Sequence, residues 1–432
     1  MKKQKYTRNL YLFVFMFCLI PHISSCAYLS ISNKDDIMQP SALDKGSERN
    51  PSYNCTVIKG KLISDGELKK STLLIVYPLS SEDSTLPDYV ILNGTSSFLL
   101  YLPEGRYHLY AITDFNNDGI YAENEVSGVY GLALSPKEIS LRRSDVVKNI
   151  VIRSAKENYG KISFPRPLGI RKSPDAISQM TYNGQISKIY DEKFSQENAT
   201  AGWWNPTAFM KAFGAHIYFL EEYDPHKIPV LFVHGAEGSP QNWIYFLIRL
   251  DRSHYQPWFF YYPSGIHLPL AAQLLYDDLT ELQRKYRFKK MCIAAHSIGG
   301  LTTRALLTKH RLNRQNNFVK LFITFATPWT GFKAADLSQV MVHKSIPSWM
   351  DLGSQSVFIK KTLSAQLPAQ IKYYLFYGKE DKVCRGNALD NRAASSAHGK
   401  FGFDCDHNTI LTDRRVYLKF NDILKKELLL SN

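Results

Sequence analysis

Residues 292–301 of the chain, CIAAHSIGGL, form an apolar run that breaks at a serine between small residues. The apolar part predicts a buried strand, and the following LTTRALLTKH has the apolar spacing of a helix. A serine at a sharp strand-to-helix turn holds its hydroxyl above the carboxyl edge of a parallel sheet. Such a turn is crowded, and Ala295 and Gly299 supply small neighbours, with alanine at a position where glycine is usual. Ser297 is therefore a candidate nucleophile, or else a small residue that fills a tight turn.

The composition indicates a globular protein. The chain has 432 residues, 44% of them apolar, which is enough for two or three domains with packed cores. Its formal net charge is +14, but no basic stripe with interleaved aromatic residues occurs, so nucleic acid is not an expected partner. A diffusely basic surface suits anionic lipid or polysaccharide better.

The amino terminus has the pattern of an export signal. MKKQKYTRNL is basic, YLFVFMFCLI is apolar, and ISSC precedes Ala27. The apolar run is too short to span a bilayer as a mature helix and fits a cleaved signal peptide over residues 1–25. Its end resembles a bacterial lipobox, which implies that Cys26 is acylated and anchors the exported protein in the bacterial envelope, at the outer membrane. The alternative is an ordinary secretory signal with a cysteine near the cut.

The rest of the chain changes pattern from segment to segment. Residues 26–52 are polar and predict a flexible tether. Residues 53–155 hold short β-branched and aromatic runs between turn residues, which predict a β-sandwich accessory domain. Residues 156–217 carry too many large apolar side chains for a linker and predict an ordered connector packed on the last domain. Over residues 218–432 apolar strands alternate with amphipathic helices, which predicts an α/β fold with a mostly parallel sheet covered on both faces.

Acyl transfer at a serine needs two backbone N–H groups aimed at the place where negative charge develops. One donor is the residue after the nucleophile, Ile298. The second comes from the loop after an earlier strand, and VLFVHGAEG places Ala236 in such a loop. Gly235 and Gly238 beside it let the backbone approach a substrate. The alternative for His234-Gly235 is a plain turn at a strand end.

An acid and a base are expected after later strands. YYLFYGKEDKV offers Asp381, with Glu380 as the alternative acid, and DCDHNTIL offers His407, with His398 in SSAHGK as its competitor. An imidazole can accept the serine proton and return it to the leaving group. A carboxylate can orient the imidazole and stabilise the imidazolium that forms. The predicted set is therefore Ser297, Asp381 and His407.

The cysteines bear on the same loops. Cys384 lies three residues after Asp381, and Cys405 lies two residues before His407. If this acid and base meet, their loops converge, so a disulfide between the two cysteines is expected in an exported chain, where disulfides persist. The alternative is two thiols. Cys292, within the apolar strand, is expected to be a buried thiol.

Residues 114–125, DFNNDGIYAENE, match a calcium-loop pattern. Positions 1, 3, 5, 6 and 12 of that pattern are occupied by Asp114, Asn116, Asp118, Gly119 and Glu125. The flanking sequence is strand-like, whereas an EF-hand has helices on both sides. The alternative is an Asx-rich turn that satisfies its own backbone. Calcium here would be structural, and no cofactor is expected for catalysis.

Residues 218–430 resemble secreted lipases and esterases of the α/β-hydrolase superfamily, triacylglycerol lipases among them, through VLFVHG, AAHSIGGL, ITFATPWTG, YGKEDKV and DHNTIL. The chain order of the predicted triad is also theirs. Residues 53–155 resemble transthyretin-like and carboxypeptidase-regulatory-like accessory modules. The resemblance implies a membrane-anchored serine hydrolase that cleaves carboxylic esters, lipid or soluble, through an acyl-enzyme. Two alternatives stay open: acyl transfer to an alcohol by the same residues, and a surface binding lipoprotein whose hydrolase domain is only a scaffold.

Overall fold

The computed structural model describes residues 56–430 apart from 65–70, 80–87, 94, 103, 133–134, 143–144, 160–161, 163, 165–169, 172–182, 310–317, 334, 337–345 and 385–390. The predicted signal peptide, Cys26 and the tether lie outside the described residues. Among the helices that are described, none is long and apolar enough to cross a membrane. The domain boundaries expected from the sequence stay predictions.

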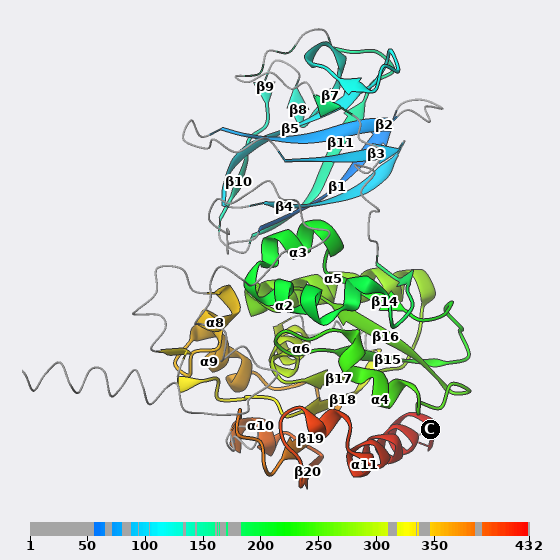
Figure 1. Cartoon of the computed structure of the whole chain (residues 1–432), viewed down its shortest axis with the longest axis vertical. Helices are drawn as coiled ribbons and strands as arrows, with labels where there is room; N and C mark the ends of the chain where they lie inside the picture. Colours follow the sequence, from blue (N-terminus) through cyan, green and yellow to red (C-terminus); the bar gives the residue numbers. More distant parts are fainter. Residues whose placement is uncertain are drawn as a thin grey trace, which may run out of the picture. The chain divides into compact units, whose positions relative to one another are not determined.

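The amino-terminal part consists of β-strands, drawn from blue to blue-green in Figure 1. One sheet has the order β11-β1-β4, and a second has the order β10-β5-β2-β3, with β7 also paired to β5. The bounds are β1 Thr56–Ser64, β2 Ser71–Pro78, β3 Asp88–Asn93, β4 Ser96–Leu102, β5 Gly105–Thr113, β6 Ile120–Tyr121, β7 Val126–Val129, β8 Gly131–Leu132, β9 Ser135–Pro136, β10 Ile139–Leu141, β11 Val146–Ser154 and β12 Ile170–Arg171.

The two sheets share an apolar core. Ile58 of β1 belongs to the same buried cluster as Leu74 of β2 and Leu109 of β5, and all three side chains are fully buried. Because side chains alternate along a strand, Ile75 lies on the opposite face of its sheet, in a second cluster with Phe164. This part is therefore a small two-layered β region, as the short β-branched and aromatic runs between turn residues predict.

The loop over residues 114–125 closes on its own backbone. The Asp114 carboxylate accepts the N–H groups of Asp118 and Gly119 at 3.2 and 3.1 Å. Glu125, the last residue of the short helix η1 (Glu123–Glu125), accepts three backbone N–H groups of the loop at 3.0, 3.1 and 3.5 Å. Both buried carboxylates are thus hydrogen-bonded to backbone amides of the loop, as in an Asx-rich turn. Calcium binding at this loop stays a prediction.

Glu125→Ala should lower the free energy of unfolding by about 2 kcal/mol, because three loop amides lose their acceptor. Glu123→Ala, in the same short helix, is the matched control and should have little effect. If the loop binds calcium, excess calcium should raise the melting temperature of the whole protein and a chelator should lower it, but not in Glu125→Ala. A melting curve that ignores both additives would exclude the ion and leave only the turn.

The carboxyl-terminal part is built on one sheet of eight strands in the order β13-β14-β16-β15-β17-β18-β19-β20. β14 runs antiparallel to β16, and all the other neighbours are parallel. The bounds are β13 Gln185–Ile186, β14 His216–Phe219, β15 Ile228–Val233, β16 Tyr255–Tyr261, β17 Met291–His296, β18 Val319–Phe325, β19 Lys372–Gly378 and β20 Gly399–Phe403. The first of these strands come from the stretch expected to connect the two domains, so that stretch contributes to the sheet itself.

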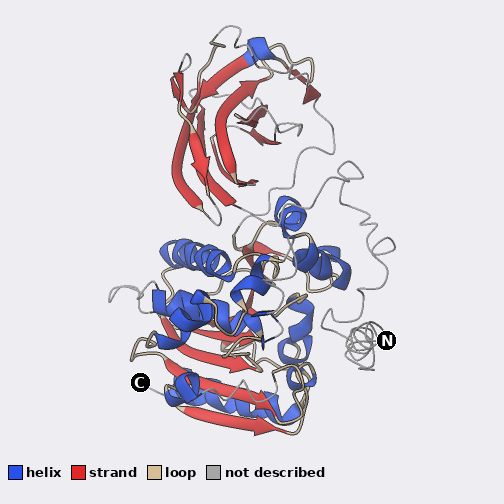
Figure 2. Ribbon diagram, turned by 90° about the vertical axis from the view of Figure 1, so that its left-hand side faces the viewer, coloured by secondary structure: helices blue, strands red, loops and turns tan. Residues whose placement is uncertain are grey.

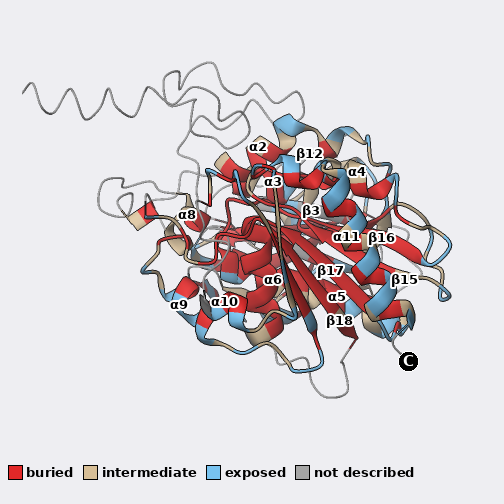
Figure 3. Ribbon diagram, turned by 90° about the horizontal axis from the view of Figure 1, so that it is seen from below, coloured by how far each residue is buried: buried red, intermediate tan, exposed pale blue. Residues whose placement is uncertain are grey.

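Helices cover both faces of this sheet: Figure 2 shows the strands between helices, and Figure 3 shows these strands coloured as buried. Adjacent side chains of β15 face different layers: the Phe232 ring lies 6.4 Å from that of Phe420 in α11, whereas Val233 lies against Gly299 of α6. A strand buried on both faces must be apolar throughout, as VLFV is. The helices are α2 Gln196–Trp204, α3 Pro206–Phe213, α4 Ile244–Leu247, α5 Leu268–Tyr286, α6 Ile298–Lys309, α8 Pro347–Asp351, α9 Val357–Ser364, α10 Asn391–Ser395 and α11 Arg414–Leu424, with the shorter turns η3 Glu192–Phe194, η4 Pro240–Trp243, η6 Thr409–Leu411 and η7 Lys425–Leu430.

Candidate active site

Ser297 lies at the turn between β17 and α6. Its φ is +51°, in the left-handed region that residues with side chains rarely adopt. Its N–H donates to the carbonyl oxygen of Phe325 at 2.9 Å. The surroundings leave no room for larger residues: a Cβ at Gly299 would lie 2.5 Å from the carbonyl oxygen of His234, and one at Gly235 would lie 2.8 Å from the Cβ of Ser297. The crowding predicted for this turn is therefore present.

The predicted acid and base meet at this serine. His407, between β20 and η6, has its Nε2 3.0 Å from Ser297 Oγ and its Nδ1 2.9 Å from Asp381 Oδ2. Asp381 follows β19, so the side chains come from loops at the ends of different strands. All three residues are buried, with 3–7% of their surface exposed. The structure therefore brings the three residues into one hydrogen-bonded chain.

Both carboxylate oxygens of Asp381 accept hydrogen bonds. Its Oδ1 accepts the N–H groups of Val383 and Cys384, each at 2.8 Å, while Oδ2 faces His407. Burial by itself would raise the pKa of Asp381, but the hydrogen bond and charge of His407, together with the two amides, hold that pKa below its ordinary value. The carboxylate is thus charged at neutral pH and oriented toward the imidazole.

The two competing residues lie elsewhere. Glu380 is exposed, and its N–H donates to the carbonyl oxygen of Cys405. His398 lies beside Tyr373 at the start of β19, whose N–H is 3.3 Å from His398 Nδ1. The start of a parallel strand is the edge of the sheet opposite to the one that carries Ser297. Neither residue reaches the serine.

The two amides expected to stabilise an oxyanion are available. Neither the N–H of Ala236 nor that of Ile298 has a hydrogen-bond partner among the described residues. Ile298 is the first residue of α6, where an N–H has no acceptor within the helix. The contact of Gly235 with Ser297 brings the preceding part of the Ala236 loop against the nucleophile. One donor therefore follows the serine in the chain, and the other follows a residue that lies against it.

Glu237, which the sequence did not single out, fixes this loop. Its backbone is also left-handed, with φ +50°. Its N–H donates to Ser264 Oγ at 3.0 Å, its carbonyl oxygen accepts from Gln196 Nε2 at 3.1 Å, and its carboxylate accepts from Trp204 Nε1 at 3.0 Å. Burial raises the pKa of Glu237 to about 7, and the bond from Trp204 only partly opposes this. Helix α2 thus holds the residue next to Ala236 through both backbone and side chain.

Two more histidines are buried beside the candidate triad. His296 Nε2 donates to the carbonyl oxygen of His407 at 2.8 Å, and burial lowers the pKa of His296 to about 3. His234 Nδ1 donates to the carbonyl oxygen of Gly235 at 2.8 Å, its ring stacks on Tyr262, and burial lowers its pKa to about 4. Both are neutral, and both fix the backbone of a site loop.

The predicted disulfide between Cys384 and Cys405 is wrong, because both residues carry thiols. The Cys384 thiol donates to the carbonyl oxygen of Ala326 at 3.2 Å and lies 3.6 Å from His407 Nδ1, whereas Cys405 packs into the apolar core under the sheet. The two loops do converge, but they are joined by backbone hydrogen bonds from Lys379 and Glu380 to carbonyls of the base loop, at 2.8 and 3.2 Å. Cys292 is a buried thiol, as predicted.

The architecture and the site together define the class. A mostly parallel sheet with a serine turn after β17, an acid after β19 and a histidine after β20 is the α/β-hydrolase fold. The fold predicted from the sequence is confirmed. Residues 268–377 match the family model described as "Putative serine esterase (DUF676)". The matched stretch runs from α5 into β19, so it contains Ser297 and ends before Asp381 and His407.

Solved esterase and lipase structures are similar to part of this chain. Lipase BlEst2 of Bacillus licheniformis in its mature form is 20% identical, with 47% of this chain and 94% of that chain covered and a TM-score of 0.37. A carboxylesterase structure from Nitrososphaera gargenis is 16% identical, with 49% and 96% covered and a TM-score of 0.35. The carboxylesterase EstE1, cloned from a metagenomic library, is 16% identical, with 49% and 83% covered and a TM-score of 0.38. A comparison with curated proteins finds no match.

The ionisation of Glu237 should appear in the stability of the protein. Its pKa in the folded state, about 7, lies above the ordinary 4.5, so stability is lost as pH rises between these values. Glu237→Gln keeps an acceptor for Trp204 and removes this loss. The difference in free energy of unfolding between the variant and the wild type should therefore shift in favour of the variant from pH 5 to pH 8. After allowance for solvent screening, the shift should be on the order of 1 kcal/mol.

Urea unfolding at both pH values measures this difference, with exposed Glu222→Gln as the control. Equal pH dependence in Glu237→Gln and the wild type would show that Glu237 ionises as an ordinary surface carboxylate.

Proposed function

We propose that the protein is a serine hydrolase that cleaves carboxylic ester bonds through an acyl-enzyme. The observation that carries the proposal is the buried hydrogen-bonded chain from Asp381 Oδ2 through His407 to Ser297 Oγ. A nucleophile within reach of a base, and a base oriented by a third group, is the arrangement that nucleophilic catalysis requires. Two amides without other partners, in the segments next to Ser297, can stabilise the negative charge that develops on the substrate oxygen.

The geometry gives each residue one role. His407 Nε2 accepts the proton of Ser297 Oγ as that oxygen attacks the acyl carbon, and the carbonyl electron pair moves onto oxygen. The amides of Ala236 and Ile298 donate to this oxyanion. When the intermediate collapses, His407 returns the proton to the leaving alcohol, and the acyl group stays on Ser297. Water then enters by the same steps and releases the acid.

The low-dielectric setting strengthens these effects. In the transition state the imidazolium of His407 lies 2.9 Å from the charged Asp381, and both side chains are almost fully buried. The attraction between the two charges is largest where water is excluded. One donor to an oxyanion is typically worth about 3–4 kcal/mol of transition-state stabilisation.

An apolar acyl group is supported by the surroundings of the Ala236 loop. Ser264 accepts a hydrogen bond from Glu237 of that loop. The next residue, Gly265, is hydrogen-bonded through its backbone to Gly202 and Ser348. The residues next to these two contacts, Trp203 and Trp349, have rings 6.3 Å apart in an edge-to-face pair. Aromatic side chains in the segments that support the Ala236 loop suit lipid esters or other esters with an apolar acyl group.

The same assays distinguish two other functions. Acyl transfer to an alcohol uses the same residues and would yield a new ester instead of a free acid. A binding lipoprotein with an inactive hydrolase domain would neither turn over esters nor react with a serine-directed probe. The complete set of Ser297, Asp381 and His407 favours activity over the scaffold.

Ser297→Ala and His407→Ala should each lower kcat for a short-chain ester by about 10⁴-fold or more, and the double variant should be little worse, because the residues act as one unit. Asp381→Asn should cost on the order of 10⁴-fold. The matched controls are His398→Ala and Glu380→Gln, which should retain activity within about tenfold.

A fluorophosphonate probe should label the wild type and not Ser297→Ala. Loss of activity in His398→Ala or Glu380→Gln, with activity kept in His407→Ala or Asp381→Asn, would reassign the base or the acid. Product analysis with added alcohol distinguishes hydrolysis from acyl transfer.

We also propose that the protein is anchored in the bacterial envelope, at the outer membrane, through acylated Cys26. The support is the basic and apolar leader followed by ISSC. In cells fed a radiolabelled fatty acid, the wild type should carry the label and fractionate with membranes. Cys26→Ser should lose the label and move to the soluble exported fraction. A labelled Cys26→Ser protein would place the lipid elsewhere.

A further inference from the structure

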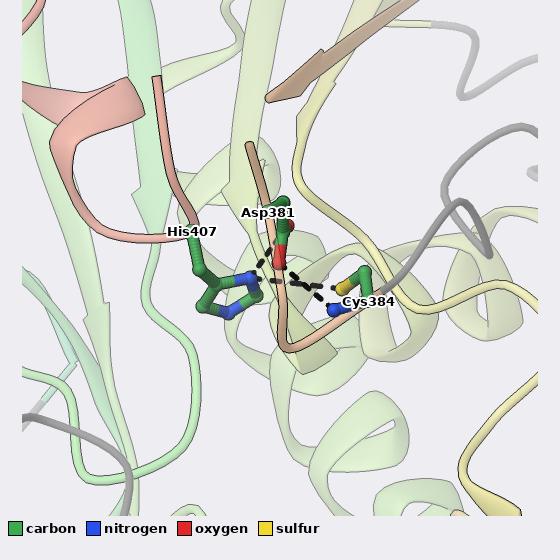
Figure 4. A group of neighbouring side chains, drawn as sticks. All are labelled: Asp381, Cys384 and His407. Carbon is green, nitrogen blue, oxygen red and sulfur yellow. Dashed lines mark hydrogen bonds and ion pairs between the residues drawn. The ribbon is translucent and has the colours of Figure 1, made fainter. Parts of the chain in front are cut away.

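A third side chain lies against the acid–base pair. Figure 4 shows Cys384 on the loop that carries Asp381, with His407 on the facing loop. A carboxylate oxygen of Asp381, the Cys384 Sγ and a ring nitrogen of His407 all lie within 4.8 Å of one another. The Sγ to Nδ1 separation is 3.6 Å and the Oδ2 to Nδ1 separation is 2.9 Å. All three residues are buried.

The mechanism proposed above gives the Cys384 thiol no role. It uses the hydroxyl of Ser297, the imidazole of His407, the carboxylate of Asp381 and two backbone amides. The thiol nevertheless lies on the Asp381 side of the imidazole, facing Nδ1 and not the serine. Thiolate, imidazole and carboxylate are the protein ligands of zinc-like cations.

We infer that Asp381, Cys384 and His407 form an inhibitory site for a thiophilic divalent cation, with Zn²⁺ as its simplest occupant. The inference rests on the proposed function, because inhibition presupposes that His407 is the base. It adds a second, regulatory use of two residues of the candidate triad.

The separations come near to what such a cation requires, and all three ligand atoms lie within 4.8 Å of one another. Zinc lies about 2.0–2.3 Å from oxygen, nitrogen and sulfur ligands in a tetrahedral site, which places the ligand atoms roughly 3.3–3.6 Å apart. The observed 3.6 Å from Sγ to Nδ1 already fits, and the 2.9 Å from Oδ2 to Nδ1 needs a small opening. Asp381 Oδ1 can keep its two amide donors, since Oδ2 is the oxygen that faces His407 Nδ1. The carbonyl oxygen of Ala326, 3.2 Å from the Cys384 sulfur, is a further oxygen beside these ligand atoms.

The charges balance in this buried site. A divalent cation with one thiolate, one carboxylate and one neutral imidazole has no net charge, which removes the main cost of burying an ion. The thiol loses its proton to solvent. His407 loses the proton on Nδ1 and gains one on Nε2, so one proton is released for each cation bound.

Inhibition follows from the tautomer. With the cation on Nδ1, the remaining proton of the neutral imidazole is on Nε2, which faces Ser297 Oγ at 3.0 Å. This nitrogen can then only donate to the hydroxyl and cannot accept its proton. The cation also takes the place of the Asp381 hydrogen bond. The serine is therefore present but not activated.

The donor set predicts selectivity. Mg²⁺ and Ca²⁺ prefer six or more oxygen ligands, and this cluster offers one carboxylate with a sulfur and a nitrogen. Zn²⁺ and Cd²⁺ should therefore inhibit ester hydrolysis, and Mg²⁺ and Ca²⁺ at the same free concentration should not. Because the cluster is buried, inhibition should develop slowly and reverse slowly with chelator.

The test compares Cys384→Ser with Cys405→Ser in the full-length protein. Residual activity is measured against buffered free Zn²⁺ and scaled to each variant's own activity without metal. The inhibition constant should rise at least tenfold in Cys384→Ser and stay within about twofold of the wild type in Cys405→Ser. Zn²⁺ that inhibits Cys384→Ser as strongly as the wild type would overturn the proposal. Cys384→Ala is the second variant if the serine form does not fold.

A readout independent of activity separates this inference from the proposed function. Cd²⁺ bound to a thiolate gives an ultraviolet charge-transfer band, which can be recorded in the Ser297→Ala background. The band should appear in Ser297→Ala. When Cys384→Ser is added, its absorbance should fall by the amount that one bound thiolate contributes. If the protein has no esterase activity but the Cys384-dependent band is present, the proposed function fails and the metal site stands. If the band does not depend on Cys384, the metal site fails.

Discussion

The left-handed backbone of Ser297 is the constraint on which the rest of the site depends. A residue with a side chain in this conformation costs on the order of 1–3 kcal/mol, and it persists only where the surroundings leave no alternative. Here the N–H of Ser297 is bound to β18 through Phe325, and α6 begins at the next residue. Gly299 has no side chain to separate α6 from the end of β15, and Gly235 has none to separate the Ala236 loop from Ser297. The backbone of Ser297 can therefore leave the left-handed conformation only if the segments packed around it move apart.

The loops around this turn are held by hydrogen bonds to one another instead of by a covalent cross-link. The backbone of the Asp381 loop bonds to that of the His407 loop, and the carbonyl oxygen of His407 is bound by His296 from the strand before the serine. The Ala236 loop is fixed by Glu237, through Ser264 and α2. Each loop thus depends on a neighbour that comes from a distant part of the sequence, which gives the site its rigidity without a disulfide.

The parts predicted correctly from the sequence are those determined by local pattern. An apolar strand followed by a small-residue turn and a helix identified Ser297, and the parallel sheet required its partners at the ends of later strands. The disulfide prediction used the convergence of two loops, which is real, but side-chain direction is set by packing: Cys405 faces the core and Cys384 faces His407. The role of Glu237 depends on Trp204 of the connecting stretch, and no local signal links residues that far apart.

Three buried histidines lie near the serine, and the nature of their partners separates the base from the others. His296 and His234 donate to carbonyl oxygens, which accept a hydrogen bond but carry no charge to offset a buried imidazolium, so burial lowers their pKa values. His407 donates to Asp381, whose negative charge offsets the proton taken from Ser297. The same carboxylate, beside the thiol of Cys384, is what suits the nitrogen to a cation. The proton on Nδ1, which leaves Nε2 free to act as the base, and a bound cation therefore compete for one ring nitrogen. Whichever of them lies between Nδ1 and Asp381 decides whether the serine is activated.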